Sequence, residues 1–143
     1  MIIQLAESDE QILNCFSTMF QLRPHLQREE FVDRIHQQMN SGYKLAFIET
    51  ENRVVAVAGF RLSECLAKGK FLYVDDLVVD EVVRSQTYGK QLFQWLIEYA
   101  KQHDCQHLEL DSGVPRFDAH RFYFRQRMSI TSYHFSINLS SLR

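Results

Sequence analysis

The stretch "VVRSQTYGKQLFQWL", residues 82–96, directly follows the apolar run "FLYVDDLVV" at 71–79. The apolar run is typical of a strand, and from residue 88 onward apolar side chains recur at spacings of three and four, as on one side of a helix. The polar loop between them therefore ends at a helix start. Backbone N–H groups there lack intrahelical partners and carry a partial positive charge, so such a loop can bind anions, phosphate groups above all.

Length and composition indicate one ordinary globular domain. A chain of 143 residues can bury a single large core. Hydrophobic residues make up 45% and charged residues 24%, which excludes a disordered or fibrous chain. We therefore expect one domain spanning residues 1–143. The net charge of -2 gives no broad attraction for nucleic acid.

The sequence offers no targeting or membrane signal. Acidic residues begin at Glu7, so the N-terminus lacks the basic flank and apolar core of a signal peptide, and no apolar run approaches the length of a membrane span. Three cysteines, Cys15, Cys65 and Cys105, are odd in number and far apart, which favours a reducing compartment over a disulfide framework. We expect a cytoplasmic protein with no membrane partner, and we interpret its cysteines as buried small hydrophobic residues.

Two histidines raise the question of a metal site. His103 and His107 have the four-residue spacing of a metal-binding pair on a helix. The pattern changes from helix to strand between them, so one helix face does not hold both. We therefore expect no metal site.

The pattern along the chain predicts a mixed α/β (α+β) layout with one central sheet. Ser8 offers an N-cap for a first helix, and residues 40–42 offer a stop signal for a second. Turn-like residues at 50–52 separate two β-rich segments, which indicates a hairpin. The predicted elements are a strand at 1–5, helices at 9–23 and 26–39, strands at 43–49, 53–62 and 71–79, a helix from 88, a strand at 107–111, a helix at 115–127 and a strand at 129–139.

Two short motifs resemble the signature of the GCN5-related N-acetyltransferase (GNAT) family. That family shows Arg or Gln, two residues, Gly, one residue, then Gly or Ala, between a strand and a helix; this chain shows "RSQTYG" at 84–89. The family later shows Ala, three residues, Tyr, and then Gly-Phe. This chain shows "AHRFY" at 119–123, with Arg127 and Met128 in place of Gly-Phe. The order of the motifs and the elements around them also match, so the resemblance covers nearly the whole chain.

The resemblance implies an acyl-CoA N-acyltransferase fold, in which helices flank a central twisted, mostly antiparallel sheet. It implies an enzyme that transfers the acetyl group of acetyl-coenzyme A (acetyl-CoA) to a primary amine of a small molecule or peptide, by direct attack in a ternary complex. The alternative is a noncatalytic acyl-CoA-binding or protein-interaction module on the same fold. The expected partners are acetyl-CoA as cosubstrate and an amine acceptor, with a homodimer left open.

The resemblance also implies the cofactor-binding residues. In the family the loop wraps the pyrophosphate of acetyl-CoA with backbone N–H groups, and the strand before it pairs with the pantetheine arm as another strand would. The corresponding residues here are Leu77, Val78 and Val79 on the strand, and Arg84, Ser85, Gln86, Thr87, Tyr88, Gly89 and Lys90 in the loop and first helical turn.

Two residues depart from the family pattern. Thr87 stands at the first glycine of the loop motif, where a β-branched residue disfavours positive φ; its hydroxyl could instead cap the helix or bond a phosphate oxygen. Arg127 stands where glycine usually ends a helix, which costs stability if that residue must be left-handed. These departures favour the noncatalytic alternative, whereas Arg84, Gly89 and Tyr123 favour the enzyme.

Aminolysis of a thioester needs a neutral amine, a polarised carbonyl and a proton for the departing thiolate. Tyr123 matches the family's tyrosine acid, with a core-packing tyrosine as the alternative, and the backbone N–H of Val79 is the family-implied donor to the acetyl carbonyl. Asp75 and Asp76 are the nearest carboxylates for a base, and strand alternation predicts that only one faces the cleft. Lesser candidates are Glu109, Asp111 and His120.

The acceptor site is the least specified part of the sequence. In the family the first helices and the last hairpin line this site. Here those segments offer Phe20, Arg23, His25, Phe31 and "SYHF" at 132–135. This mixture of aromatic and basic residues suits an amine with an apolar or acidic neighbour.

Overall fold

The computed structural model describes residues 1–84 and 87–142, so the predicted cofactor residues Ser85 and Gln86 lie outside the described residues. The chain forms two compact units, Met1–Leu110 and Asp111–Arg143. The single domain expected over residues 1–143 therefore stays a prediction. Among the described residues, no helix is both long and apolar enough to cross a membrane.

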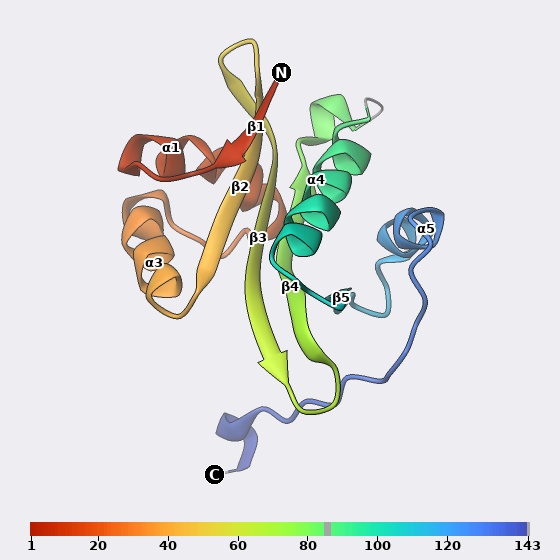
Figure 1. Ribbon diagram of the computed structural model, residues 1–143. Coiled ribbons are helices and arrows are strands. Elements are labelled where there is room, and N and C mark those ends of the chain that lie inside the picture. The colour runs from red at the N-terminus through yellow and green to blue at the C-terminus, as the bar shows by residue number, and fades with distance from the viewer. Residues whose placement is uncertain (85–86, 143) are drawn as a thin grey trace. The chain divides into compact units, whose positions relative to one another are not determined.

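The first unit holds the sheet and most of the helices (Figure 1). Its elements are β1 (Ile2–Leu5), α1 (Asp9–Asn14), α2 (Phe16–Leu22), α3 (Arg28–Asn40), β2 (Tyr43–Thr50), β3 (Arg53–Cys65), β4 (Gly69–Val79), the 3₁₀ helix η1 (Glu81–Val83), α4 (Tyr88–Gln102) and β5 (His107–Leu110). The strands follow one another in the order β1-β2-β3-β4-β5. All neighbours are antiparallel except β4 and β5, which are parallel.

Two apolar clusters cover the two faces of this sheet. One joins α1, α2 and α3 to side chains such as Phe47 and Val57. The other joins α4 to side chains such as Ile48 and Phe60 from the same two strands. Because neighbouring residues of a strand point to opposite faces, the sheet is buried between α1–α3 and α4. The predicted class, a mostly antiparallel sheet flanked by helices, is confirmed.

Local signals placed the element boundaries well. Ser8 caps α1 through its hydroxyl, and the Gln11 side chain bonds back to the Ser8 N–H, which completes a capping box. Glu51 and Asn52 form the β2–β3 turn at φ values of 53° and 60°, as a two-residue hairpin with both residues at positive φ requires. The predicted first helix is instead two helices, because the helical run is interrupted at Cys15 between α1 and α2.

A β-bulge interrupts the pairing of β3 with β4. Gly59 pairs with Asp76, whereas Phe60 pairs with Val74, so Asp75 is an extra residue on β4. The bulge changes which side chains share a face. Val74 packs in the α4 cluster and Val78 in the α1–α3 cluster, although a regular strand would place both on one face.

The second unit contains α5 (Phe117–Arg125) and the 3₁₀ helix η2 (Leu139–Leu142). After α5, the N–H of Met128 bonds the Tyr123 carbonyl and the N–H of Arg127 bonds the Phe124 carbonyl. Arg127 has φ 67°. This is the left-handed turn that usually takes glycine at the end of a helix, so the left-handed position considered for Arg127 is confirmed.

The strand predicted at 129–139 is wrong. Residues 129–138 belong to no strand or helix, and η2 begins at Leu139. A strand needs a neighbour that bonds its backbone N–H and C=O groups, and among the described residues no strand pairs with this segment. Its β-like sequence pattern is therefore present without the partner that would make it a strand.

The cysteines differ in their surroundings, and all three are free. Cys15 is buried and Cys105 is partly buried. Burial raises the pKa of the Cys15 thiol to about 12, which keeps it protonated and unreactive. The interpretation of Cys65 as a buried residue is wrong, because this residue ends β3 and is exposed.

Candidate active site

The second half of β4 has one free edge. On one side, β3 pairs with nearly the whole length of β4. On the other side, β5 pairs only with residues Phe71–Val74 of β4. From Asp75 to Val79, no strand among the described residues lies hydrogen-bonded on the β5 side (Figure 1). Because β4 and β5 part after Val74, backbone groups of residues 75–79 can bond a ligand there.

The bonds around Val79 show which backbone groups face this free edge. The N–H of Asp80 donates to a carbonyl of β3 at 2.8 Å. Since successive residues of a strand point their backbone groups in opposite directions, the N–H and C=O of Val79 face away from β3. Consistent with this, the Nε of Arg84 donates to the Val79 carbonyl oxygen at 3.3 Å. By the same alternation, the N–H of Leu77 faces the free edge and that of Val78 faces β3.

Asp80 fixes the start of the loop that follows β4. Its carboxylate accepts the N–H of Val82 at 3.0 Å and pairs with the Arg53 guanidinium at 2.6 Å. Burial acts to raise the pKa of Asp80, but these hydrogen bonds and one from Gln21 outweigh burial, and the pKa is lowered. The carboxylate therefore stays charged and caps η1.

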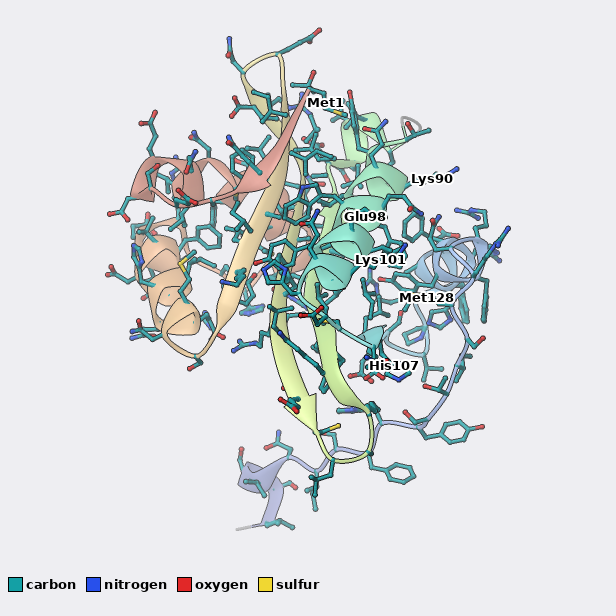
Figure 2. All side chains as sticks on the ribbon, viewed as in Figure 1. Met1, Lys90, Glu98, Lys101, His107 and Met128 are labelled. Carbon is teal, nitrogen blue, oxygen red and sulfur yellow. The ribbon has the colours of Figure 1, made fainter. Side chains whose placement is uncertain are left out.

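Thr87 fits the start of α4 without strain. It is the N-cap residue with φ -86°, so the positive φ considered at this position is not required. Its hydroxyl makes no helix cap and instead accepts the Gln91 side chain at 2.9 Å. Tyr88, Gly89 and Lys90 form the first turn, whose N–H groups lack intrahelical acceptors. Figure 2 shows Lys90 projecting outward from this turn.

The bulge brings both aspartates to one pocket. The expectation that only one would face the cleft is wrong, because the extra residue Asp75 reverses the alternation before Asp76. Both line a pocket of about 370 Å³. The two oxygens of Asp76 accept from Arg23 Nε at 2.9 Å and from the Tyr43 hydroxyl at 2.8 Å. One oxygen of Asp75 accepts from Arg61 Nε at 2.9 Å.

The two carboxylates are not equivalent as bases. Burial raises the pKa of Asp75 above its usual value, against the opposing effect of Arg61. Its Oδ1 has no hydrogen-bond partner among the described residues, whereas both oxygens of Asp76 are engaged. Burial, and then the charge of Asp76, raise the pKa of Tyr43 far above its usual value, so Tyr43 remains a donor to Asp76. Asp75 therefore suits a proton acceptor better than Asp76.

The pocket contains some of the predicted acceptor residues and several that sequence reasoning missed. Phe20 is outside the lining, and residues 132–135 belong to the second unit. The lining residues are Met19, Arg23, His25, Leu26, Phe31, Arg34, Ile35, Gln38, Tyr43, Arg61, Asp75 and Asp76. A helical spacing from the predicted Phe31 would have found Arg34 and Gln38, which lie three and seven residues further on.

Gly59 leaves the space that the Tyr43 side chain occupies in the pocket. A Cβ at Gly59 would lie 1.8 Å from the Tyr43 hydroxyl oxygen, far inside any contact distance. The tyrosine ring therefore occupies the room that another residue at position 59 would fill. A glycine inside a strand pattern is itself a sequence signal for such a close approach.

Tyr123 lies on α5 in the second unit and is partly buried. Burial raises the pKa of its hydroxyl, against the opposing effect of Arg116, so the group carries its proton at neutral pH, as an acid must. Its role in catalysis stays a prediction.

The lesser base candidates are engaged locally. Glu109 pairs with Lys68 at 2.6 Å, and Asp111 lies 3.6 Å from the His134 ring. His120 Nε2 lies 2.8 Å from the Gly113 carbonyl oxygen, which requires a proton on that nitrogen.

His103 and His107, the two histidines with the spacing of a metal-binding pair, lie on different elements. His103 is the C-cap residue of α4, and its ring stacks on Tyr99 with 4.1 Å between ring centroids. His107 begins β5. In the described part of the chain, no group of three or more His, Cys, Asp or Glu side chains is arranged to hold a metal ion.

Comparison with known proteins identifies the family. The family model described as "Acetyltransferase (GNAT) family" matches residues 10–128. The chain belongs to the GNAT acetyltransferase family. This GNAT chain is 31% identical over 130 residues to the uncharacterized N-acetyltransferase YhdJ of Bacillus subtilis, a match that covers 90% of this chain and 92% of the relative. It is 36% identical over 63 residues to the aminoalkylphosphonate N-acetyltransferase of Salmonella typhimurium, covering 44% and 41% of the two chains.

Solved structures show the same GNAT fold. The glucosamine-6-phosphate N-acetyltransferase from Arabidopsis thaliana is 25% identical with a TM-score of 0.76, covering 96% of this chain and 97% of the other. The ribosomal-protein-alanine N-acetyltransferase from Brucella melitensis is 14% identical with a TM-score of 0.82, covering 96% and 99%. The GNAT chain is thus an N-acetyltransferase of a family that uses acetyl-CoA and amine acceptors, and the noncatalytic alternative is not favoured.

Proposed function

We propose that this GNAT enzyme acetylates the primary amine of a small molecule by direct attack in a ternary complex with acetyl-CoA. The observation that carries the proposal is the free edge of β4 beside the pocket that holds Asp75 and Asp76. A pocket of about 370 Å³ suits a small molecule. Two relatives are named for small amines, an aminoalkylphosphonate and glucosamine-6-phosphate, which supports the same class of acceptor here.

In this proposal acetyl-CoA lies along the free edge of β4 and across the start of α4. The pantetheine arm pairs with the backbone at Leu77–Val79, as an added strand would. The pyrophosphate lies at the first turn of α4, where N–H groups and the helix dipole favour an anion. The residues proposed for this phosphate site are Arg84, Ser85, Gln86, Thr87, Tyr88, Gly89 and Lys90.

The proposed reaction is aminolysis of the thioester. Asp75 takes a proton from the ammonium group, directly or through water, and the neutral nitrogen attacks the carbonyl carbon. The N–H of Val79 stabilises the resulting oxyanion. When the C–S bond breaks, Tyr123 gives its proton to the thiolate. The new C–N bond remains, the nitrogen's second proton restores Tyr123, and the first proton leaves Asp75 for solvent.

Cofactor binding tests this proposal first. Acetyl-CoA at a hundred times its dissociation constant should stabilise the fold by about 2.7 kcal/mol and raise its melting temperature. Gly89→Asp should abolish the shift, because a carboxylate adds bulk and negative charge where the pyrophosphate lies. Gly113→Asp is the matched control. Gly113 lies in the second unit, away from the phosphate loop in sequence, and a Cβ there would come no closer than 3.7 Å to its neighbours, so the variant should fold and keep the shift.

Two outcomes would contradict the proposal. An unchanged shift in a well-folded Gly89→Asp variant would place the cofactor elsewhere. A wild-type protein that binds acetyl-CoA but releases no thiol with any amine of a broad panel would favour the noncatalytic module instead.

We also propose that two copies of the chain associate through residues 129–139. Tyr133, Phe135 and Ile137 alternate along this segment and are 86%, 91% and 63% exposed. Such alternation is typical of a strand with one covered face, and exposed apolar side chains of this kind often mark an interface. Sedimentation should therefore show a homodimer that Phe135→Glu weakens, and a monomer at all concentrations would contradict this. The expected cytoplasmic location stays a prediction.

A further inference from the structure

The pocket beside β4 carries its charges in two groups. Asp75 and Asp76 lie on the sheet side, with side chains only 28% and 14% exposed. His25 and Arg34 also line the pocket, before α3 and on α3, and both are exposed. The pocket therefore has a partly buried group, in which Arg23 and Arg61 pair with the two aspartates, and an exposed basic group.

The arginines of the lining outnumber its aspartates, and one arginine is unpaired among the described residues. Arg23 pairs with Asp76, and Arg61 pairs with Asp75. Arg61 is fully used, because it also donates to the Ser41 carbonyl at 3.2 Å and to the Gln38 side chain. Among the described residues, the guanidinium of Arg34 makes no hydrogen bond or ion pair. Three arginines against two aspartates leave the pocket with one positive charge in excess.

Resting on the proposed function, we propose that the acceptor is a small molecule that carries an anionic group as well as its primary amine, with the amine bound at Asp75 and the anion at Arg34 and His25. The free Oδ1 of Asp75 is an acceptor for the ammonium group. A free guanidinium binds a carboxylate, phosphate or phosphonate through two parallel hydrogen bonds. An amine without an anion would leave this guanidinium unused.

The remaining lining fits the hydrocarbon that joins two such groups. Apolar side chains from α2, α3 and the segment between them complete the pocket: Met19, Leu26, Phe31 and Ile35. Burial of a short aliphatic chain against them adds affinity without a further polar contact. The free Oδ1 of Asp75 and the free guanidinium of Arg34 then fix which end of the acceptor meets Asp75.

Three amines of similar length test the proposal: aminoethylphosphonate, beta-alanine and ethylamine. With saturating acetyl-CoA and free thiol as the readout, the two anionic amines should have kcat/KM values on the order of 10-fold higher than ethylamine. Arg34→Gln should remove this advantage by raising KM for the anionic amines while leaving ethylamine unchanged. Arg28→Gln is the control on the same helix, because Arg28 is outside the pocket lining, and it should change none of the three values.

The outcomes separate this proposal from the proposed function. Equal kcat/KM for ethylamine and the anionic amines, or an equal loss for all three in Arg34→Gln, would overturn the anionic acceptor and leave the acetyltransferase in place. Thiol release with none of the three, while acetyl-CoA still raises the melting temperature, would also overturn it. If acetyl-CoA does not raise the melting temperature, the proposed function itself fails.

Discussion

The two halves of β4 have different neighbours. Phe71–Val74 lies between β3 and β5 and is hydrogen-bonded on both sides. Among the described strands, residues 76–79 pair only with β3, and Asp75 is the extra residue of the bulge. In the first half the backbone groups are used within the sheet, whereas in the second half every other residue presents its groups to a free edge. One strand is thus structural at its start and available to a ligand at its end.

Side chains change at the same point. Leu72 and Val74 in the first half are 0% and 4% exposed and belong to the α4 cluster. The bulge at Asp75 follows at once and turns two carboxylates into the pocket. Stability and chemistry are therefore separated along a single strand, so substitutions in the two halves should have different consequences.

The largest expected effect concerns a residue outside β4. Neither half of the strand supplies an acid for the leaving thiolate, and Tyr123 is proposed for that step. Tyr123→Phe removes only the hydroxyl, so folding and acetyl-CoA affinity should change little. We expect kcat to fall on the order of 10²- to 10⁴-fold with the KM for acetyl-CoA unchanged, measured by steady-state kinetics. An unchanged kcat, once chemistry is shown to limit turnover, would rule out Tyr123 as the essential acid.

The first half of β4 should be sensitive in stability. Leu72 is fully buried, so Leu72→Ala should lower the free energy of unfolding by about 2–5 kcal/mol, measured by urea denaturation. The kcat of the molecules that remain folded should be unchanged. A large loss of kcat in a Leu72→Ala protein that is fully folded would contradict the separation of stability and chemistry between the two halves of β4.

Gly59 faces Asp76 across the bulge and should affect both properties. In Gly59→Ala the new Cβ must displace Tyr43 from Asp76, which should cost about 1–3 kcal/mol in stability and weaken the acceptor site. The control is the same change in a Tyr43→Ala background. There the added loss should be smaller, because the hydroxyl and the ring carbons that the Cβ would meet, at 1.8, 2.3 and 2.6 Å, are gone. Equal losses in the two backgrounds would show that the clash lies elsewhere.

The smallest expected effect lies just after the free edge. The pKa of Asp80 is lowered in the folded state. The hydrogen bonds of its carboxylate therefore stabilise the fold fully above the unfolded-state pKa, about 3.9. This stabilisation is lost as the pH falls through the folded-state pKa. Asp80→Asn should cost less than about 1 kcal/mol at pH 7. The melting temperatures of the variant and the wild type should converge as the pH is lowered below the folded-state pKa of Asp80. A difference that is constant with pH would contradict this.

The sequence predicted the elements whose signals are local. The N-cap at Ser8, the turn at Glu51 and Asn52, and the helix start at Tyr88 each depend on residues within a few positions of one another. Such signals are present in the sequence itself, whatever packs against the element. This explains why most helix and strand positions agree with the structure.

The sequence did not predict features that depend on distant partners. The bulge at Asp75 arises from the register between β3 and β4, so alternation alone placed only one aspartate in the cleft. The pocket joins Arg34, Tyr43 and Arg61 from three different elements, and no local pattern links them. The segment at 129–139 has a strand's pattern but lacks a neighbour among the described residues.

Amide hydrogen exchange along β4, measured by NMR with and without acetyl-CoA, tests most directly whether the free edge binds the cofactor. The N–H groups of Leu77 and Val79 face that edge, whereas the N–H of Val78 is directed to β3. Saturating acetyl-CoA should slow exchange at Leu77 and Val79 much more than at Val78, because only the first two gain a new acceptor. Unchanged exchange at Leu77 and Val79 with the cofactor bound would contradict the account.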